Sequence, residues 1–461
     1  MAKKKTLVPF DTAENEILEW MEAHPQEVIQ ERQRFMQELL KRRCSYSDGG
    51  TLPVTLAPMF LKPDSLELIT RVTEDLDKIL DKAIQLYFKD EHVKSYFPYP
   101  DIPEEWIQWD PGYKKPTMLS RHDALYDGKT LKFIEFNTDN PGGRGWHDTY
   151  NSLASESGLF KDLIETYCQP EDRSMLHALK DTLLHCYAEW GGSKKKPRVA
   201  LVSFKEFFKG SDDEIVRDFL IEHGIEANLV DARELTYRNG KLYSGNVQID
   251  IVNLCLRFTF FKRFPREMKD FLNALRDGAI CCVNHFRATL GSQKEMLSFL
   301  SNEENHHYFT SEEAACLNEY LPWTRKMDET ITLSAEGETV ALQEYAIKNR
   351  DKLVLKPSWA AGGYEVYVGQ FTESEKWHEA IASAVGCPWW ILQEAADIPE
   401  YEFPTIHGKK VVMEKKNLNL NPYVYNGKYV GCLGRISGSK VINVSAGGGI
   451  IPVFGLKTLK A

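Results

Sequence analysis

Two neighbouring runs of residues, 118–126 and 130–137, have the composition of β-strands, and each carries two polar residues spaced two apart. Side chains two apart on a strand share a face, so each pair points in one direction. Magnesium takes oxygen ligands from one or two carboxylates together with phosphate oxygens, and an arginine beside them suits a phosphoryl group. The spacing therefore predicts a metal and phosphate site. Its residues are Arg121, Asp123, Glu135 and Asn137.

The register of this predicted hairpin decides whether the four side chains can meet. A two-residue turn at Asp127-Gly128 would pair Asp123 with Lys132 and put Asp123 on the face opposite Glu135. A three- or five-residue loop, or a β-bulge, would put all four side chains on one face. The alternative is an amphipathic hairpin whose charges simply face solvent. The spacing alone leaves both interpretations open.

A second motif follows the predicted strand 352–359, which contains Lys356. The loop after it contains Gly362 and Gly363, and another predicted strand begins beyond. A glycine loop can lay backbone N–H groups over phosphate oxygens while a lysine supplies positive charge. An ordinary hairpin loop is the alternative for this weak motif.

A third motif is the strand 389–396, which ends in Gln393 and Glu394 and leaves as a loop. Such a strand end can act as a hinge that hydrogen-bonds an adenine edge, with Glu400 or Glu402 receiving ribose hydroxyls. Taken alone, it is equally a strand end with surface acids.

A fourth motif starts at Arg435 and reaches the three glycines 447–449, which allow either close approach to a ligand or a flexible loop. His306-His307 has no partner at zinc-ligand spacing, and neither a GxSxG nor a Walker-type sequence is present.

Composition limits the class of protein. The chain has 461 residues, of which 43% are hydrophobic and 27% charged, so it is not a disordered chain. The net charge of −10 argues against a general nucleic-acid binder. No run reaches the ~18 apolar residues of a membrane span. The start has no apolar run after its basic cluster, and the nine scattered cysteines suit free thiols in a reducing compartment, so a cytoplasmic protein is expected.

The predicted secondary structure differs between successive parts of the chain. Residues 14–42 and 64–90 have helical periodicity. Residues 197–286 alternate strands and helices at the spacing of a parallel α/β unit, and antiparallel strands dominate after 350. The predicted domains are an N-terminal helical region (1–117), a metal-ligand part (118–190), an α/β domain (191–290) and the nucleotide-binding subdomains (291–461).

In chain order, these motifs resemble those of the ATP-grasp superfamily of carboxylate–amine ligases. That family has a lysine at a helix start, a lysine in a strand ending KP, a hinge glutamate, then Arg-x-Asp and Glu-x-Asn. Here SQKEMLSFL, VLKP and LQE match the first three motifs, whereas SRHD and EFNTDNPGG come first in the chain. The sequence is therefore similar, over roughly 118–454, to circularly permuted members such as the glutathionylspermidine synthetase domain and uncharacterised relatives.

The resemblance implies a mixed α/β (α+β) fold: a circularly permuted ATP-grasp core with antiparallel grasp sheets and a Rossmann-like pre-ATP-grasp domain. It also implies roles for individual residues. ATP would bind at Lys294, Lys356, Gly362, Gly363, Gln393, Glu394, Ala396 and Glu402. Two Mg²⁺ ions, or Mn²⁺, would bind at Asp123, Glu135 and Asn137. Arg121 and Arg435 would stabilise the transferred phosphoryl group.

The activity implied by the resemblance is an ATP-dependent carboxylate–amine ligase that forms an amide through an acyl phosphate and releases ADP and phosphate. The expected partners are a small carboxylate and an amine of the amino acid, peptide or polyamine class, without nucleic acid or membrane; a homodimer is an allowed assembly. A phosphotransferase of the same fold and a nucleotide-binding regulator are the alternatives. All of these require Glu135 and Lys356 to face one nucleotide.

Overall fold

The structure is a computed structural model. Gly362 and Gly363 of the predicted glycine loop lie outside the residues it describes. Within the described part, no helix has the length and apolar character needed to cross a membrane. The described residues are 19–45, 52, 57–98, 102–139, 141–158, 160–168, 174–208, 212–358, 365–408, 410–438, 442 and 448–457.

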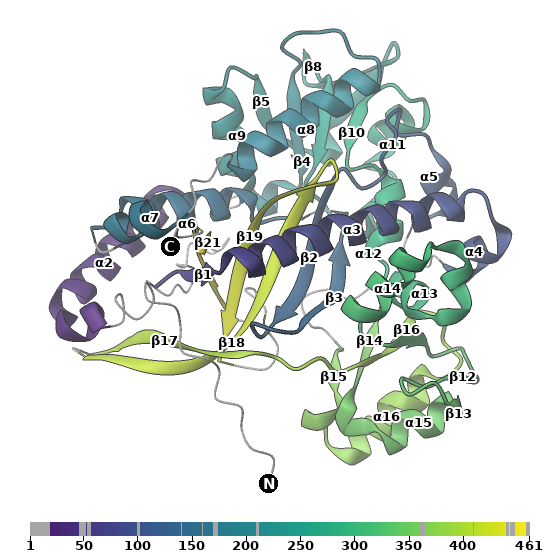
Figure 1. The fold of residues 1–461 in the computed structure, drawn as a ribbon. Helices are drawn as coiled ribbons and strands as arrows, with labels where there is room; N and C mark the ends of the chain where they lie inside the picture. The colour runs from purple at the N-terminus through teal and green to yellow at the C-terminus, as the bar shows by residue number, and fades with distance from the viewer. Residues whose placement is uncertain are drawn as a thin grey trace.

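A six-stranded antiparallel sheet lies at the centre of the fold and joins strands from distant parts of the sequence (Figure 1). The order is β20-β19-β18-β2-β3, and β17 pairs with the first half of β18. Because β18 pairs with β2, Tyr423 lies opposite Arg121. The strands are β2 (Leu119–Tyr126), β3 (Leu131–Asn137), β17 (Glu400–His407), β18 (Lys410–Tyr425), β19 (Lys428–Ser437) and β20 (Gly449–Ile451).

Helix α3 (Pro63–Tyr87) crosses one face of the central sheet (Figure 1). Its apolar stripe, predicted from the helical spacing, is buried at Val72 and Leu76 and packs in one core with Phe133 of β3 and Leu420 of β18. This face of the sheet is therefore used for packing. Arg121 and Asp123 of β2, and Glu135 and Asn137 of β3, lie on the other face.

A four-stranded parallel sheet, in the order β10-β9-β4-β5, forms the upper part of the molecule in Figure 1. It confirms the parallel α/β arrangement that the strand–helix–strand spacing predicts. The hairpin β6–β7 beside it turns at Asn239-Gly240, where both residues have positive φ. The elements are β4 (Val199–Ser203), β5 (Ala227–Asp231), β6 (Leu235–Arg238), β7 (Lys241–Ser244), β8 (Val247–Gln248), β9 (Ile251–Leu254), β10 (Cys281–Val283), α8 (Met175–Glu189), α9 (Asp212–Glu222), α10 (Thr259–Arg263) and α11 (Lys269–Arg276).

A second antiparallel sheet, in the order β11-β16-β14-β15, lies below the central sheet in Figure 1. It has a separate small core in which Leu355 and Leu392 pack against Trp377. Helix α13 contacts β11 and β16. The elements are β11 (Thr324–Lys326), β12 (Ile331–Leu333), β13 (Thr339–Ala341), β14 (Leu353–Pro357), β15 (Tyr367–Val368), β16 (Trp390–Glu394), α13 (Glu295–Ser301), α14 (Ser311–Tyr320), α15 (Leu342–Lys348) and α16 (Ser374–Ala384).

The end of the chain returns to a segment near its beginning. Strand β21 (Val453–Gly455) pairs in parallel with β1 (Met59–Leu61), which leads directly into α3. The C-terminal part is thereby tied to the helix that covers the central sheet. The remaining helices are α2 (Pro25–Lys41), α4 (Glu91–Tyr96), α5 (Glu104–Gln108), α6 (Arg144–Glu156), α7 (Lys161–Tyr167) and α12 (Thr289–Ser292).

Several boundaries differ from those predicted from the sequence. The predicted helix 14–42 breaks at His24, and α2 begins at Pro25, which suits the first position of a helix because it has no N–H to donate. Among residues 365–371 of the predicted strand 364–371, only β15 is a strand. Residues 441 and 443–447 of the predicted strand 441–449 lie outside the described residues, and β20 begins at Gly449. The predicted strand 409–417 continues to Tyr425 as one strand.

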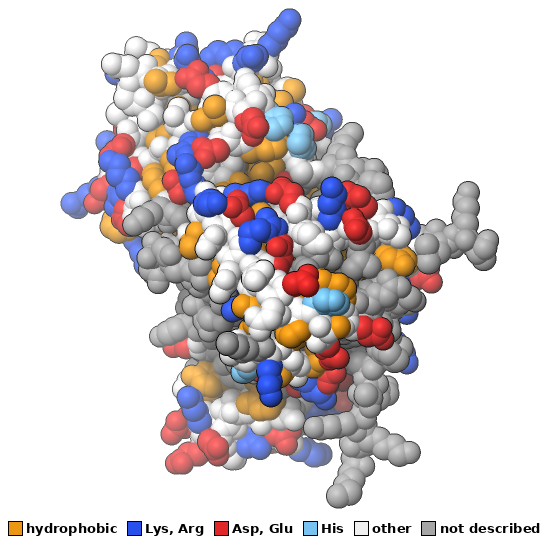
Figure 2. Space-filling model, turned by 90° about the vertical axis from the view of Figure 1, so that its left-hand side faces the viewer, with side chains coloured by type: hydrophobic (Ala, Val, Ile, Leu, Met, Phe, Trp, Pro, Cys, Tyr) orange, Lys and Arg blue, Asp and Glu red, His pale blue; other side chains and the backbone are white. Residues whose placement is uncertain are grey.

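The surface carries charges of both signs. Figure 2 shows Lys and Arg side chains mixed with Asp and Glu side chains over the visible face, without an extended basic stripe among the described residues there. All nine cysteines are free thiols, and only Cys316 and Cys387 are partly exposed.

Candidate functional site

The central sheet and the second sheet meet at β3. The ammonium Nζ of Lys294, which immediately precedes α13, lies 3.1 Å from Oε1 of Glu135 on β3. Lys294 is 5% exposed, and the Glu135 side chain retains 31%. Glu394 at the end of β16 interacts electrostatically with Lys132, also on β3. Residues of the two layers therefore approach each other along β3.

Asp123 is the centre of the predicted metal cluster. Its Oδ1 accepts hydrogen bonds from Nδ2 of Asn137 (3.1 Å) and Nε of Arg121 (3.4 Å), and its Oδ2 accepts one from Arg435 on β19. Burial alone would raise the pKa of Asp123, but Arg435 and Arg121 outweigh it and hold the pKa below its ordinary value. Asp123 is therefore a buried, ionised carboxylate. The structure brings Arg435, predicted from a separate motif, into the same cluster.

A β-bulge places these polar residues on one face. Tyr126 pairs with Leu131 around a four-residue loop, and this register alone would separate Asp123 from Glu135. The ladder shifts between Asp123 and Ala124, so that Asp123 pairs with Glu135. The sequence required an odd-numbered loop or a bulge for the four polar side chains to share one face. The structure has a bulge, in which Ile134 is the extra residue.

The donor set fits magnesium bound together with a nucleotide. Asp123, Glu135 and Asn137 offer two carboxylates and an amide oxygen. Among the described residues, no three His, Cys, Asp or Glu side chains could hold a metal ion by themselves. Magnesium needs only one or two protein carboxylates when phosphates and water supply the other ligands. The residues therefore suit an ion that arrives with phosphate.

Lys356 on β14 is 9% exposed and is oriented by a neighbouring strand. Its Nζ donates to Oε1 of Gln393 on β16 (2.6 Å), and Nε2 of Gln393 donates to Oγ1 of Thr324 (3.1 Å). The side chain of Gln393, considered from the sequence as part of an adenine hinge, therefore points to Lys356 and holds it.

The pKa of Lys356 is also affected by the carboxylates of the central sheet. The pKa of Lys356 is lowered to about 8, chiefly because burial disfavours the ammonium. The carboxylates of Glu135 and Asp123 counteract this lowering, whereas Lys294 adds to it. The side chains of residues 135 and 356 are therefore close enough to interact, as a shared nucleotide site requires.

The loop before α6 rests on the same face of the sheet. The carbonyl oxygen of Gly142 accepts hydrogen bonds from Oη of Tyr423 (2.6 Å) and Nη1 of Arg121 (3.3 Å). Gly143 follows with φ of 97°. The carboxylate of Asp212 accepts from four successive backbone N–H groups, 143–146, and so caps the start of α6. The end of the loop that leads into α6 is thus held by the sheet on one side and by Asp212 on the other.

Sequence reasoning missed a row of buried amides on β18. Asn417, Asn419 and Asn421 are at most 4% exposed, and Oδ1 of Asn421 accepts a hydrogen bond from Arg435. Nδ2 of Asn421 donates to Oδ1 of Asn419 (3.2 Å), which extends the polar cluster along the strand. The signal was present as the alternation NLNLNP, in which the leucines face the core.

Three of the residues predicted to bind adenine or ribose are partly or fully exposed. Glu394 is exposed, and its backbone N–H donates to the carbonyl of Trp323 (2.8 Å). Ala396 is half-buried. Glu402 is exposed on β17 opposite Lys415.

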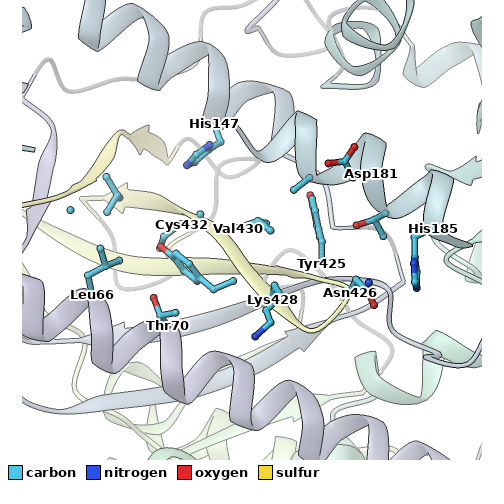
Figure 3. Close-up of a pocket in the computed structure, with 16 residues that line it drawn as sticks. Leu66, Thr70, His147, Asp181, His185, Tyr425, Asn426, Lys428, Val430 and Cys432 are labelled. Carbon is cyan, nitrogen blue, oxygen red and sulfur yellow. The ribbon is translucent and has the colours of Figure 1, made fainter. Parts of the chain in front are cut away.

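A separate cavity of about 690 Å³ opens at the β18–β19 hairpin. Figure 3 shows it between α3, α8 and the hairpin, with Thr70, Asp181 and Lys428 on its walls. None of the residues predicted to bind the nucleotide, the metal or the phosphoryl group lines this cavity. The predicted site is instead the junction of the two sheets at β3.

The chain matches no protein-family model and no curated protein sequence. Its structure is similar to that of a glutathione synthetase-like effector from Globodera pallida in its apo form, with a TM-score of 0.63 and 12% identity over 93% of this chain and 97% of that one. A putative γ-glutamylcysteine synthetase from Methylobacillus flagellatus aligns with a TM-score of 0.41 and 11% identity over 83% and 88% of the two chains, a score that supports no further argument. The first likeness shows that this chain has the mixed α/β fold, with antiparallel sheets, of a glutathione synthetase-like protein.

Proposed function

We propose that this protein is an ATP-dependent ligase that joins a small carboxylate to an amine and releases ADP and phosphate. The observation that carries the proposal is the contact between Lys294 and Glu135, with buried Lys356 beside them. Cations from one layer and carboxylates from another face a common space, an arrangement that suits a triphosphate held between lysines and a metal. The fold shared with a glutathione synthetase-like protein supports the same class.

In this proposal, each group acts by position and charge. Lys294 and Lys356 hold phosphate oxygens, and Asp123, Glu135 and Asn137 hold magnesium, which would neutralise phosphate charge. Arg121 and Arg435 lie on either side of Asp123 and stabilise the phosphoryl group as it passes to the substrate carboxylate. An amine then attacks the acyl phosphate and expels phosphate. No covalent bond to the protein forms, so catalysis consists of positioning and electrostatics.

The arrangement of the chain is part of the proposal. The acid cluster lies on β2 and β3, early in the sequence, while the lysines and Arg435 come after residue 290. We interpret this as the permuted order of an ATP-grasp core, with the parallel sheet as the Rossmann-like domain that precedes it. The domain limits 1–117, 118–190, 191–290 and 291–461 belong to this interpretation.

The adenine side of the site is assigned by the resemblance. Gln393, Glu394 and the backbone near Ala396 would read the adenine, Glu402 would reach the ribose, and Gly362 and Gly363 would cover the phosphates. Of these, Gln393 contacts a phosphate-binding lysine of the proposal directly, because it accepts a hydrogen bond from Lys356.

The test is a phosphate-release screen in which ATP and Mg²⁺ are combined with pairs of amino acids, short peptides and polyamines. A ligase gives ADP, phosphate and an amide, whereas a phosphotransferase gives ADP and a phosphorylated acceptor without free phosphate. Glu135→Gln should lower turnover by about 100-fold or more. Glu226→Gln, which makes the same change at an exposed ion pair with Arg198, should leave it unchanged. Full turnover in Glu135→Gln would refute the metal assignment.

A further inference from the structure

A buried hydrogen-bonded group lies directly behind Lys294. Ser358, which follows β14 and is 6% exposed, accepts a hydrogen bond through Oγ from the backbone N–H of Lys294 (3.0 Å). The Ser358 hydroxyl donates to Oε2 of Glu295 and lies 3.2 Å from Oε1 of Gln293. The carbonyl oxygen of Ser358 accepts from Nζ of Lys294 (3.4 Å). Ser358 therefore touches both the backbone and the ammonium of Lys294.

The burial of the Glu295 side chain at this place lowers the stability of the folded protein. It is 1% exposed, and its Oε1 has no hydrogen-bond partner among the described residues. A buried carboxylate loses its hydration and recovers only part of it from partners, so an apolar side chain here would favour stability. The contribution of Glu295 is therefore to geometry, and the group it holds is Ser358.

We propose that Glu295 is a positioning residue of the nucleotide site, which acts through Ser358 to keep the Lys294 ammonium against Glu135. This inference rests on the proposed function, because it concerns how the phosphate-binding lysine is placed. The path consists of three contacts: Glu295 to Ser358, Ser358 to Lys294, and Lys294 to Glu135.

Counting hydrogen-bond donors and acceptors around Ser358 shows which protonation state of Glu295 lets every one of these groups form a hydrogen bond. The Ser358 hydroxyl has one hydrogen but two acceptors, Gln293 and Glu295. A protonated Glu295 can donate to Ser358, which then donates to Gln293 while still accepting from Lys294. Burial raises the pKa of Glu295 to about 7, while Ser358 and the ammonium groups of Lys294 and Lys326 oppose the rise. Part of the protein therefore has a neutral Glu295 near physiological pH.

The test measures the dissociation constant of ATP with Mg²⁺ by calorimetry, together with thermal unfolding, for wild type, Glu295→Ala, Ser358→Ala and the double variant. We expect each single change to weaken ATP binding about 10-fold, because each removes one hydrogen bond from the path. The double variant should be no weaker than either single one, since both act through the same contact. Glu295→Gln, a neutral side chain of the same shape, should bind ATP within about 3-fold of wild type.

Asp250→Asn is the matched control, because Asp250 is a buried carboxylate bonded to Lys194 and to the backbone of Arg198 in the parallel sheet. It should leave ATP binding unchanged. If wild type binds ATP and Glu295→Ala binds it equally well, Glu295 has no positioning role, whatever its effect on unfolding. Additive losses in the double variant would also overturn the proposal. If wild type itself does not bind ATP, the proposed function fails first, and the two failures are thereby distinguished.

Discussion

The Lys294 ammonium lies 3.1 Å from the Glu135 carboxylate, although about 160 residues separate them in sequence. The pair joins a helix that packs on the second sheet to the edge strand of the central sheet. The Glu135 side chain is 31% exposed, and the attraction is offset by the loss of hydration of the buried Lys294 ammonium, so the net contribution to stability is small, on the order of 0–1 kcal/mol. The pair is better placed to bind a ligand than to hold the fold together.

Lys294→Met should therefore separate function from stability. We expect ATP affinity to fall by about 10-fold or more, because one charge-assisted contact to phosphate is lost. The free energy of unfolding, measured by urea titration, should change by less than about 1 kcal/mol. Lys161→Met, a change at an exposed ion pair with Glu165, serves as the control. A large loss of stability with unaltered ATP affinity would contradict this reading of the pair.

Lys356 should make stability depend on pH. Its pKa in the folded protein is about 8, against 10.5 for an ordinary lysine, so between these values the unfolded chain binds more protons. The contribution of Lys356 to the free energy of unfolding therefore rises with pH across this window. Below about pH 8, the buried ammonium costs at most about 3 kcal/mol.

Lys356→Met should accordingly stabilise the protein without nucleotide at pH 7, by up to about 3 kcal/mol, and the gain should vanish above about pH 10.5. Exposed Lys352→Met should show no such gain. Phosphate should raise the pKa of Lys356, so ATP binding near pH 8 should take up protons, which calorimetry in buffers of different ionisation enthalpy detects. Equal heats in all buffers would argue against contact between Lys356 and phosphate.

Two glycines with similar φ angles allow a controlled test of the loop before α6. A Cβ at Gly143 (φ 97°) would lie 2.8 Å from the Tyr423 hydroxyl, whereas one at Gly128 (φ 89°) would meet nothing within 4 Å. Both Ala variants carry backbone strain of about 1–3 kcal/mol. Only Gly143→Ala should also displace Tyr423 from Gly142 and lower turnover. Equal turnover in the two variants would show that this contact is dispensable.

A buried ion pair on the opposite face of the sheet should matter for folding alone. Nζ of Lys115 lies 2.7 Å from Oδ2 of Asp77, which is fully buried in α3. Burial alone would raise the pKa of Asp77, but Lys115 and His122 outweigh it and lower the pKa. The contribution of Asp77 to stability is therefore present above its ordinary pKa and is lost as the pH falls through the lowered value.

Lys115→Met should cost about 3–5 kcal/mol in urea unfolding, because it leaves Asp77 buried without its partner. Adding Asp77→Asn should recover part of this loss, since the uncompensated charge is gone. ATP affinity should follow only the fraction of folded protein. A cost below about 1 kcal/mol for Lys115→Met would contradict this interpretation, because it would mean that the Asp77 carboxylate does not depend on Lys115 for compensation of its charge.

That residues two apart within one strand share a face could be predicted from the sequence, because strand alternation is local. Glu135 and Asn137 share a face for that reason alone. The bulge at Asp123 could not be predicted, because the four-residue loop and the core packing of Phe133 and Ala124 choose the register together. The amide row at 417–421 was visible as alternation but lacked a partner motif to give it meaning.

Contacts between distant segments were beyond sequence reasoning. Nothing in the composition of SQKE or KPS indicates that Ser358 closes on Glu295, because that contact depends on how α13 packs against the second sheet. Likewise, Gln393 has the polarity of a hinge residue, and only the antiparallel pairing of β14 with β16 turns it toward Lys356.

The pairing of β18 with β2 has a consequence for synthesis of the chain. Arg121 leaves the ribosome roughly 300 residues before Tyr423, the residue it will face. During that interval, the β2–β3 hairpin exposes its inner edge, and such an edge can pair with the wrong strand. We expect maturation of this protein to be slow and to benefit from chaperones, since its central sheet can close only after β18, β19 and β20 have been made.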